Sequence, residues 1–122
     1  MAVTGLDHVQ LAIPAGGEDR ARALFVGVLG MREVEKPPRL SREGCWFEGG
    51  GAAIHVGVDP DFHPATKAHP ALLVADLETT KLALEQSGYP IEKDKPITGY
   101  DRIFTSDSFG NRIELMPRKS DS

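Results

Sequence analysis

The sequence is poor in the features that mark disulfide-rich, membrane-spanning and nucleic-acid-binding proteins. It has a single cysteine, Cys45, so no disulfide can form within the chain. No segment approaches the roughly 18 consecutive apolar residues of a membrane helix. No cluster of lysine and arginine is present to attract a phosphate backbone, and the formal net charge is −4. The sequence therefore argues against a membrane span and against nucleic acid as a partner.

The beginning of the sequence also lacks a secretory signal. The residues "MAVTGLDH" have neither the basic nor the apolar region of such a signal, so we expect a cytoplasmic protein. With 122 residues, 40% of them hydrophobic and 26% charged, the chain fits one globular domain over residues 1–122. We expect Cys45 to be a small buried or half-buried strand residue rather than a reactive thiol.

Hydrophobic periodicity divides the chain into two halves of like order. The first half, about residues 5–58, predicts strands at 6–13, 31–35, 44–48 and 52–58 and a helix near 18–29 that ends at Gly30. The second half, about 69–117, predicts strands near 69–75, 91–93, 102–106 and 112–116 and a helix near 77–87. Asp76 is the expected N-cap of that helix and Gly88 its end. Residues 59–68 form a proline-containing connector, so the sequence predicts an α+β fold of two βαβββ modules.

Four polar residues lie in strand-like runs whose alternate positions are apolar. They are His8 in "LDHVQLAI", His55 in "AAIHVGV", His69 in "AHPALLV" and Glu114 in "NRIELM". Because strand side chains alternate between two faces, each lies opposite an apolar row that must be buried. His69 follows His8 by 61 residues and Glu114 follows His55 by 59, so the four occupy the first and last strands of both modules. Three imidazoles and a carboxylate on one face are typical of a metal site.

Other side chains are candidates for the surroundings of this site. Alternation places on the ligand face Gln10, Gly57, Ala71, Arg112 and Met116. Candidates for apolar pocket walls are Trp46, Phe47, Tyr100, Phe104 and Met116. Core packing is the preferred interpretation for Phe47 and Phe104, and we expect His63, in the connector, to be exposed and outside the site.

The catalytic residue is not identified by the sequence; the candidates are Tyr100 and Arg112, and Arg102 is considered with Arg112 for contact with a substrate. Tyr100, in "PITGYDR", is a candidate proton donor or lid residue. Arg112 is a candidate for a two-pronged contact with an anionic group of a substrate, as is Arg102. A solvated strand charge is the alternative for both arginines.

The paired βαβββ order and four segments resemble the vicinal oxygen chelate superfamily. The segments are "LDHVQLAI", "LFVGVLGM", "AHPALLVADL" and "DSFGNRIELM". That superfamily includes glyoxalase I, fosfomycin-resistance thiol transferases, extradiol dioxygenases, methylmalonyl-CoA epimerase and bleomycin-binding proteins. The resemblance covers nearly the whole chain. It implies two modules that form a half-open barrel around one divalent metal, which holds a substrate through two adjacent oxygens; in many short members the paired modules come from a homodimer.

The resemblance places metal ligands on His8, His69 and Glu114, and the departure from glyoxalase I is at His55. Glyoxalase I has a second glutamate there, which also moves the proton, and a metal-bound imidazole cannot easily serve as that base. Without His55 the set is two histidines and a carboxylate, as in ferrous oxygenases. With His55, four ligands leave two neighbouring positions of an octahedral ion for a bidentate substrate. The expected ion is Zn, Fe(II), Ni, Co or Mn.

The implied function is that of a metal-dependent enzyme acting on a small molecule with adjacent oxygens. Glyoxalase-like lyase or isomerase chemistry, or resistance-type transferase chemistry, ranks above ring cleavage, because extradiol enzymes usually carry two such two-module units. An Fe(II) extradiol-type dioxygenase is one alternative. The other is a non-catalytic small-molecule or antibiotic-binding protein of the bleomycin-resistance kind, although such relatives usually lack the metal ligands.

Overall fold

The computed structural model describes residues 1–92 and 101–118 and contains two compact units, residues 1–63 and 64–122. We call them unit one and unit two. Tyr100 lies outside the described residues, as does Lys93 of the strand predicted at 91–93. In the described ranges, no helix has the length and apolar character needed to cross a bilayer. The subdivision of a single domain at residues 58 and 69 stays a prediction.

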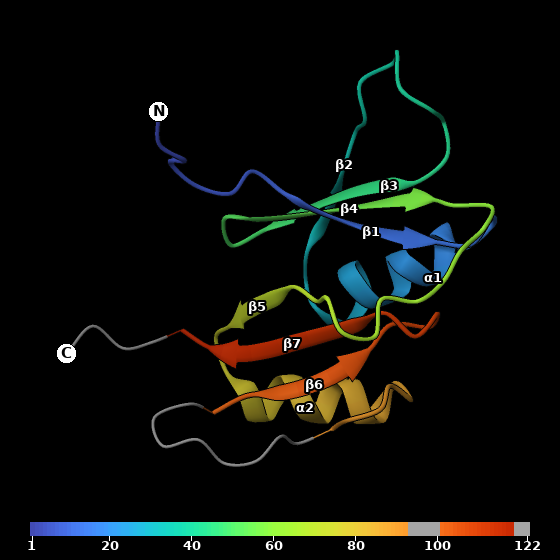
Figure 1. The fold of residues 1–122 in the computed structure, drawn as a ribbon. Helices are drawn as coiled ribbons and strands as arrows, with labels where there is room; N and C mark the ends of the chain where they lie inside the picture. The colour runs from blue at the N-terminus through green and yellow to red at the C-terminus, as the bar shows by residue number, and fades with distance from the viewer. Residues whose placement is uncertain (93–100, 119–122) are drawn as a thin grey trace. The chain divides into compact units, whose positions relative to one another are not determined.

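Unit one is a four-stranded sheet with one helical segment against it (Figure 1). The strands are β1 (Val9–Ile13), β2 (Arg32–Val34), β3 (Cys45–Gly49) and β4 (Ala52–Val58), in the order β1-β4-β3-β2. β1 and β4 are parallel, and the other two pairs are antiparallel. The helical segment is α1 (Glu18–Arg22), which continues directly as η1 (Ala23–Val28).

The helical segment of unit one differs from the single α-helix that the sequence predicts. Residues Ala23–Val28 form a π-helix, in which the Leu29 N–H donates to the Leu24 carbonyl five residues earlier, at 2.9 Å. The predicted apolar stripe is nevertheless buried at Leu24 and Phe25. A pattern of apolar residues indicates which side of a helix is buried. It does not distinguish the hydrogen bonds of an α-helix, between residues four apart, from those of a π-helix, between residues five apart.

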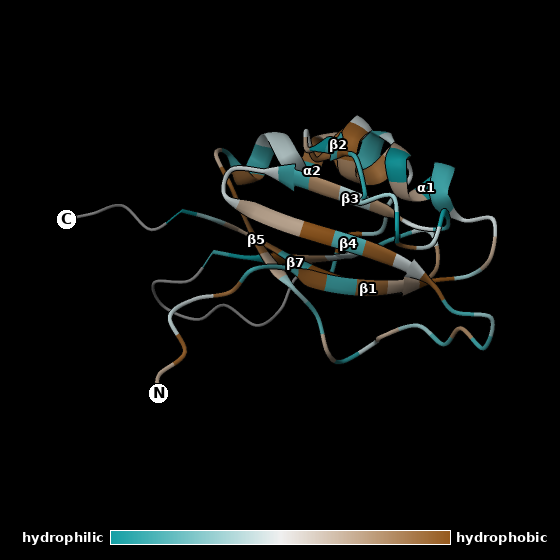
Figure 2. Cartoon of the chain, turned by 90° about the horizontal axis from the view of Figure 1, so that it is seen from above, coloured by the Kyte–Doolittle hydropathy of each residue, from teal (hydrophilic) through white to brown (hydrophobic). Residues whose placement is uncertain are grey.

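The core of unit one lies between this helix and the sheet. The rings of Phe25 and Phe47 stack with centroids 5.3 Å apart, and both side chains are buried. Figure 2 shows hydrophobic and hydrophilic residues alternating along β1 and β4, so the apolar row packs inward and the polar row remains on the opposite face. Cys45 is buried as expected, and burial raises the pKa of its thiol to about 11.

Unit two repeats the arrangement with a three-stranded sheet and one helix. Its elements are β5 (Ala71–Val74), α2 (Leu77–Gln86), β6 (Ile103–Ser106) and β7 (Arg112–Pro117), with strand order β5-β7-β6. β5 and β7 are parallel and β6 and β7 antiparallel, which matches β1, β4 and β3 of unit one. In place of a full fourth strand, the described residues contain the isolated bridge between Glu92 and Phe104. Asp76 caps α2 as predicted, accepting hydrogen bonds from two N–H groups of the first turn.

The turn that leads into β7 is held by a buried polar network. The Asp107 carboxylate accepts from the N–H groups of Phe109 and Asn111, both at 2.9 Å, and from the Asn111 amide at 2.8 Å. The Asn111 side-chain oxygen accepts from the Ala65 N–H at 2.9 Å. Gly110 has φ of 93°, a backbone conformation that glycine adopts without steric cost. The network thus fixes where β7 begins.

Candidate metal centre

The two candidate ligands of each unit occupy equivalent positions on neighbouring parallel strands. His55 pairs with Gln10 across β4 and β1, and His8 lies two residues before Gln10. In unit two, Glu114 pairs with Ala71 across β7 and β5, and His69 again lies two residues before its strand partner. Both histidines precede the first strand of their unit, whereas the sequence predicts that they lie within it. In both units, therefore, the histidine and the second candidate share one face of the sheet.

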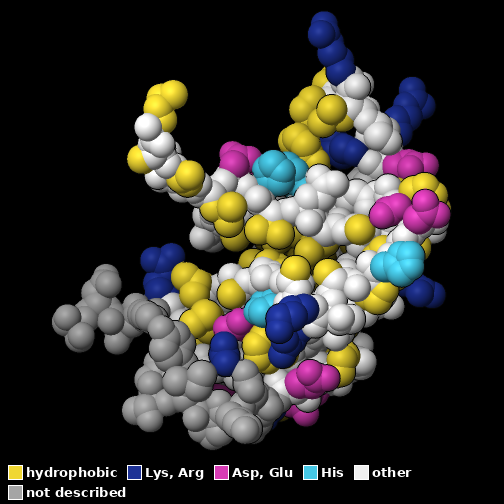
Figure 3. All heavy atoms as spheres, viewed as in Figure 1, with side chains coloured by type: hydrophobic (Ala, Val, Ile, Leu, Met, Phe, Trp, Pro, Cys, Tyr) yellow, Lys and Arg dark blue, Asp and Glu magenta, His cyan; other side chains and the backbone are white. Residues whose placement is uncertain are grey.

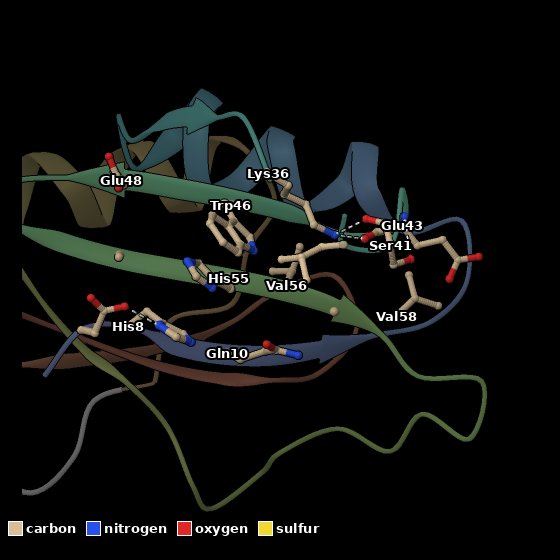
Figure 4. A pocket seen from close by; sticks show the side chains of 14 residues that line it. His8, Gln10, Lys36, Ser41, Glu43, Trp46, Glu48, His55, Val56 and Val58 are labelled. Atoms are coloured by element: carbon tan, nitrogen blue, oxygen red, sulfur yellow. Dashed lines mark hydrogen bonds and ion pairs between the residues drawn. The ribbon is translucent and has the colours of Figure 1, made fainter. Parts of the chain in front are cut away.

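Three rings are stacked on this face of unit one (Figure 4). The imidazoles of His8 and His55 have centroids 3.9 Å apart and planes inclined by 18°. The indole of Trp46, which pairs with His55 across β3 and β4, lies 4.0 Å from the His55 ring at 4°. Asp7 accepts a hydrogen bond from His8 Nδ1 at 2.7 Å, and this leaves Nε2 of His8 to bind a ligand.

The environment of His55 favours a neutral ring. Burial, together with the neighbouring His8 imidazole, lowers the pKa of His55 below its usual value. A neutral imidazole has one nitrogen with an available lone pair, which is the form that binds metals. The hydrogen bond from His8 likewise holds the pKa of Asp7 below that of an ordinary aspartate.

In unit two the histidine and the carboxylate are in direct contact. His69 Nε2 lies 3.0 Å from Glu114 Oε1, and the Glu114 side chain is 9% exposed. His69 Nδ1 lies 2.7 Å from the Lys67 carbonyl oxygen. Since that oxygen can only accept, Nδ1 must carry a hydrogen, as it does in His8.

The contact between His69 Nε2 and the Glu114 carboxylate oxygen requires a proton or a metal ion between the two atoms. With Nδ1 protonated, a neutral His69 ring has a lone pair on Nε2, so Nε2 and the Glu114 carboxylate oxygen are both acceptors. A proton carried by either group, or a metal ion, must therefore account for their approach. Two ligand atoms bound at about 2.1 Å and at right angles would lie about 3.0 Å apart. The chemistry and the spacing of this pair therefore fit a divalent metal.

Each unit contributes a pair of candidate ligands rather than a full set. Over residues 1–92 and 101–118, no three His, Cys, Asp or Glu side chains are arranged to hold one ion. The pairs are His8 with His55 and His69 with Glu114. The meeting of all four around one ion stays a prediction. His63 is exposed, as expected, and its Nδ1 donates to the Asp61 carbonyl oxygen.

Two arginines lie beside the His69–Glu114 pair. Arg102 Nη1 is 3.6 Å from Glu114 Oε2, on the oxygen that His69 does not contact. The guanidinium carbon of Arg112 lies 3.8 Å from the centroid of the Phe104 ring, and that of Arg102 lies 5.4 Å from it. The edge of the Phe104 ring also meets His69, with centroids 5.3 Å apart. Phe104 is buried beneath these groups.

A pocket of about 670 Å³ lies on the ligand face of unit one. Its walls include His8, His55 and Trp46, so Trp46 is a wall residue as the sequence suggests. Phe47 is fully buried, and the interpretation of Phe47 and Phe104 as packed residues is confirmed.

Sequence reasoning missed the residues that hold the site in place. Asp7 orients His8, and its place directly before that histidine was the available signal. Lys36 borders the pocket, where its Nζ donates to the carbonyl oxygens of Ser41 and Glu43 and closes the loop between β2 and β3 (Figure 4). No local pattern predicts that loop conformation.

Comparisons with known proteins agree with this architecture. The model of the Glyoxalase/Bleomycin resistance protein/Dioxygenase superfamily matches residues 5–115. A crystal structure described as a glyoxalase family protein from Bacillus anthracis is 42% identical, with 98% of each chain covered and a TM-score of 0.90. The comparison with curated proteins gave no match.

Two more distant structures share the fold. The fosfomycin resistance protein FosX from Listeria monocytogenes is 16% identical, covers 99% of this chain and 96% of its own, and has a TM-score of 0.74. FosX from Mesorhizobium loti is 17% identical, covers 97% and 95%, and has a TM-score of 0.73.

The fold and the paired strand positions define a two-module α+β protein of the vicinal oxygen chelate class. The family match extends over most of the sequence. The chain belongs to the Glyoxalase/Bleomycin resistance protein/Dioxygenase superfamily.

Proposed function

We propose that the chain is a metal-dependent enzyme whose ion is held by His8, His55, His69 and Glu114. The observation that carries the proposal is the repeated geometry of the two units. In each, a histidine whose Nδ1 faces an oxygen acceptor lies beside a second candidate ligand on the neighbouring parallel strand. Hydrogen bonds of this kind orient metal-binding imidazoles in proteins. A four-ligand centre needs one pair from each kind of unit, from the same chain or from two chains of a homodimer.

The proposed substrate is a small molecule with two adjacent oxygens. A divalent ion would supply Lewis-acid polarisation to those oxygens. The chain's own contribution is to orient His8 through Asp7 and to provide the flat wall of Trp46 beside the site. A structure of a Listeria FosX variant contains Mn(II) and 1S,2S-dihydroxypropylphosphonic acid; it supports a ligand class with neighbouring oxygens, not a particular substrate.

Among the reactions of the superfamily, we favour lyase, isomerase or transferase chemistry over ring cleavage. The chain has one pair of units, whereas extradiol enzymes usually have two pairs. Its alignment with the glyoxalase family protein from Bacillus anthracis covers 98% of each chain. Because His55 replaces the glutamate expected of glyoxalase I, we do not assign that reaction. The identity of the metal separates the remaining classes, since iron would favour dioxygen chemistry and zinc, nickel, cobalt or manganese would favour the others.

The test is the metal content of protein purified without added metal. We expect stoichiometric divalent metal in the wild type and its loss in His8→Ala and Glu114→Ala, with far-UV circular dichroism unchanged. His63→Ala is the matched control, because this exposed histidine belongs to neither pair. Unchanged metal content in both ligand variants would refute the proposal.

A non-catalytic binding protein is the second candidate function. The observation that favours it is the row of parallel rings from His8 through His55 to Trp46, a flat aromatic surface inside a pocket of about 670 Å³. Such a surface suits a planar apolar ligand. Tight binding of a planar aromatic compound by metal-free protein, with no stoichiometric metal in the wild type, would favour this function over the enzyme.

A further inference from the structure

We propose that Arg112 is an anion-binding residue, so that the substrate carries an oxyanion group beside its two metal-binding oxygens. As a statement about a substrate, this inference rests on the metal-dependent function proposed above. Arg112 and Glu114 are two residues apart on β7 and therefore point to the same face of the sheet. A group bound by Arg112 would thus lie beside the proposed ligand Glu114.

The Arg112 guanidinium is held in place by an aromatic side chain. Its central carbon lies 3.8 Å from the centroid of the Phe104 ring, and Phe104 is only 3% exposed. Phe104 pairs directly with Glu114 across β6 and β7, so the position of the Phe104 ring relative to the proposed metal ligand Glu114 is fixed by the strand register. A guanidinium stacked in this way loses little conformational freedom when an oxyanion binds to its edge.

Of the two arginines that contact Phe104, Arg102 lies near a carboxylate and Arg112, in the part of the chain that the structure describes, does not. Arg102 lies 3.6 Å from the Glu114 carboxylate, which also contacts His69. Within residues 1–92 and 101–118, the Arg112 guanidinium has no carboxylate at ion-pair distance, and its described interaction is the Phe104 ring. Figure 3 shows Lys and Arg side chains gathered beside a histidine and an acidic side chain on this unit. A half-buried guanidinium without a carboxylate is suited to an external anion.

Comparison of the two units shows that this charge is specific to unit two. Trp46 pairs with His55 as Phe104 pairs with Glu114, so the two sheets can be compared residue by residue. The unit one position equivalent to Arg112 is Ala53, which pairs with Glu48. The equivalent pair in unit two is Arg112 with Ser106. The fold therefore does not require a cation at this position, and its presence in unit two calls for a functional reason.

The experiment compares two probes that share a vicinal diol and differ in charge. Glycerol 1-phosphate and glycerol are titrated into zinc-loaded protein, and binding is followed by NMR shifts of the arginine Nε–H groups and the β7 amides. The variants are Arg112→Gln, Arg112→Lys and the control Arg118→Gln, which removes an exposed charge just beyond β7. The same proteins are titrated with inorganic sulfate in the absence of metal.

We expect wild-type protein to bind glycerol phosphate more tightly than glycerol. Arg112→Gln should weaken glycerol phosphate binding by about tenfold and leave glycerol unchanged, because it removes one charge-assisted contact. Arg112→Lys should recover part of the affinity, and Arg118→Gln should have no effect. Wild-type affinity in Arg112→Gln, or no preference for the charged probe in the wild type, would overturn the proposal.

The sulfate titration separates this proposal from the proposed metal site. If zinc does not bind, the metal-dependent function fails, while sulfate binding that depends on Arg112 still supports the anion site. If zinc binds but neither anion responds to Arg112→Gln, the anion site fails and the metal site stands.

Discussion

Replacing Asn111 by alanine should destabilise unit two strongly, because this side chain joins the connector to the turn before β7. Asn111 is 1% exposed and donates to the Asp107 carboxylate at 2.8 Å. Its side-chain oxygen accepts from the Ala65 N–H at 2.9 Å. A hydrogen bond to a charged group contributes about 1.5–3 kcal/mol and a neutral one about 0.5–1.5 kcal/mol. We therefore expect Asn111→Ala to lower the free energy of unfolding by about 3 kcal/mol.

Urea unfolding followed by two signals measures this effect. Far-UV circular dichroism reports on both units, whereas the fluorescence of Trp46, the single tryptophan, reports on unit one. Ser108→Ala, an exposed substitution in the same turn, is the control and should change stability by less than about 0.5 kcal/mol. If Asn111→Ala unfolded in circular dichroism at the same urea concentration as Ser108→Ala, the network would not be fixing the start of β7.

Two further predictions concern unit one. Arg22 donates to Glu33 at 2.7 and 3.2 Å and lowers the pKa of that carboxyl. The stabilisation is therefore present above the unfolded-state pKa of about 4.3 and is lost as pH falls through the lower folded-state pKa. At pH 7, wild type should be more stable than Glu33→Gln by less than about 1 kcal/mol, because both side chains of the pair are more than a third exposed. In unfolding curves measured at acid pH this difference should vanish. A difference that persisted in acid would contradict the ion pair. Gly44→Ala should cost more than about 2 kcal/mol in thermal unfolding, since φ is 87° and the new methyl group would overlap the Val56 carbonyl oxygen. Gly27→Ala, which meets open space, is its control, and equal stability of the two variants would refute the steric argument.

Much of the fold follows from sequence patterns because its elements are short and strongly alternating. The strand predicted at 52–58 has the observed bounds, Asp76 is the N-cap of α2, and Gly88, with a positive φ, follows directly after its C-cap. The second half was recognisable because the order of its patterns repeats. The strand predicted near 91 differs, since Glu92 forms an isolated bridge.

The contacts within the candidate site were less accessible to sequence reasoning. Alternation predicts that His55 faces away from the core, but its stacking on Trp46 depends on the register between β3 and β4. The approach of Arg102 to Glu114 depends in the same way on the pairing of β6 with β7. The pattern of one strand predicts which face each side chain points to, but not the register between that strand and its neighbour. Contacts between strands therefore become known only from the assembled sheet.

The two-unit architecture assigns aromatic contacts and charged contacts to different halves of one small protein. Each sheet satisfies its own backbone hydrogen bonds, so a change of polar residue on one half leaves the ladder of the other half untouched. The face of unit one carries a row of stacked rings, and the face of unit two carries two arginines around Phe104. Substitutions of charged residues in unit two can therefore change which compounds bind, while the stacked rings of unit one remain unchanged.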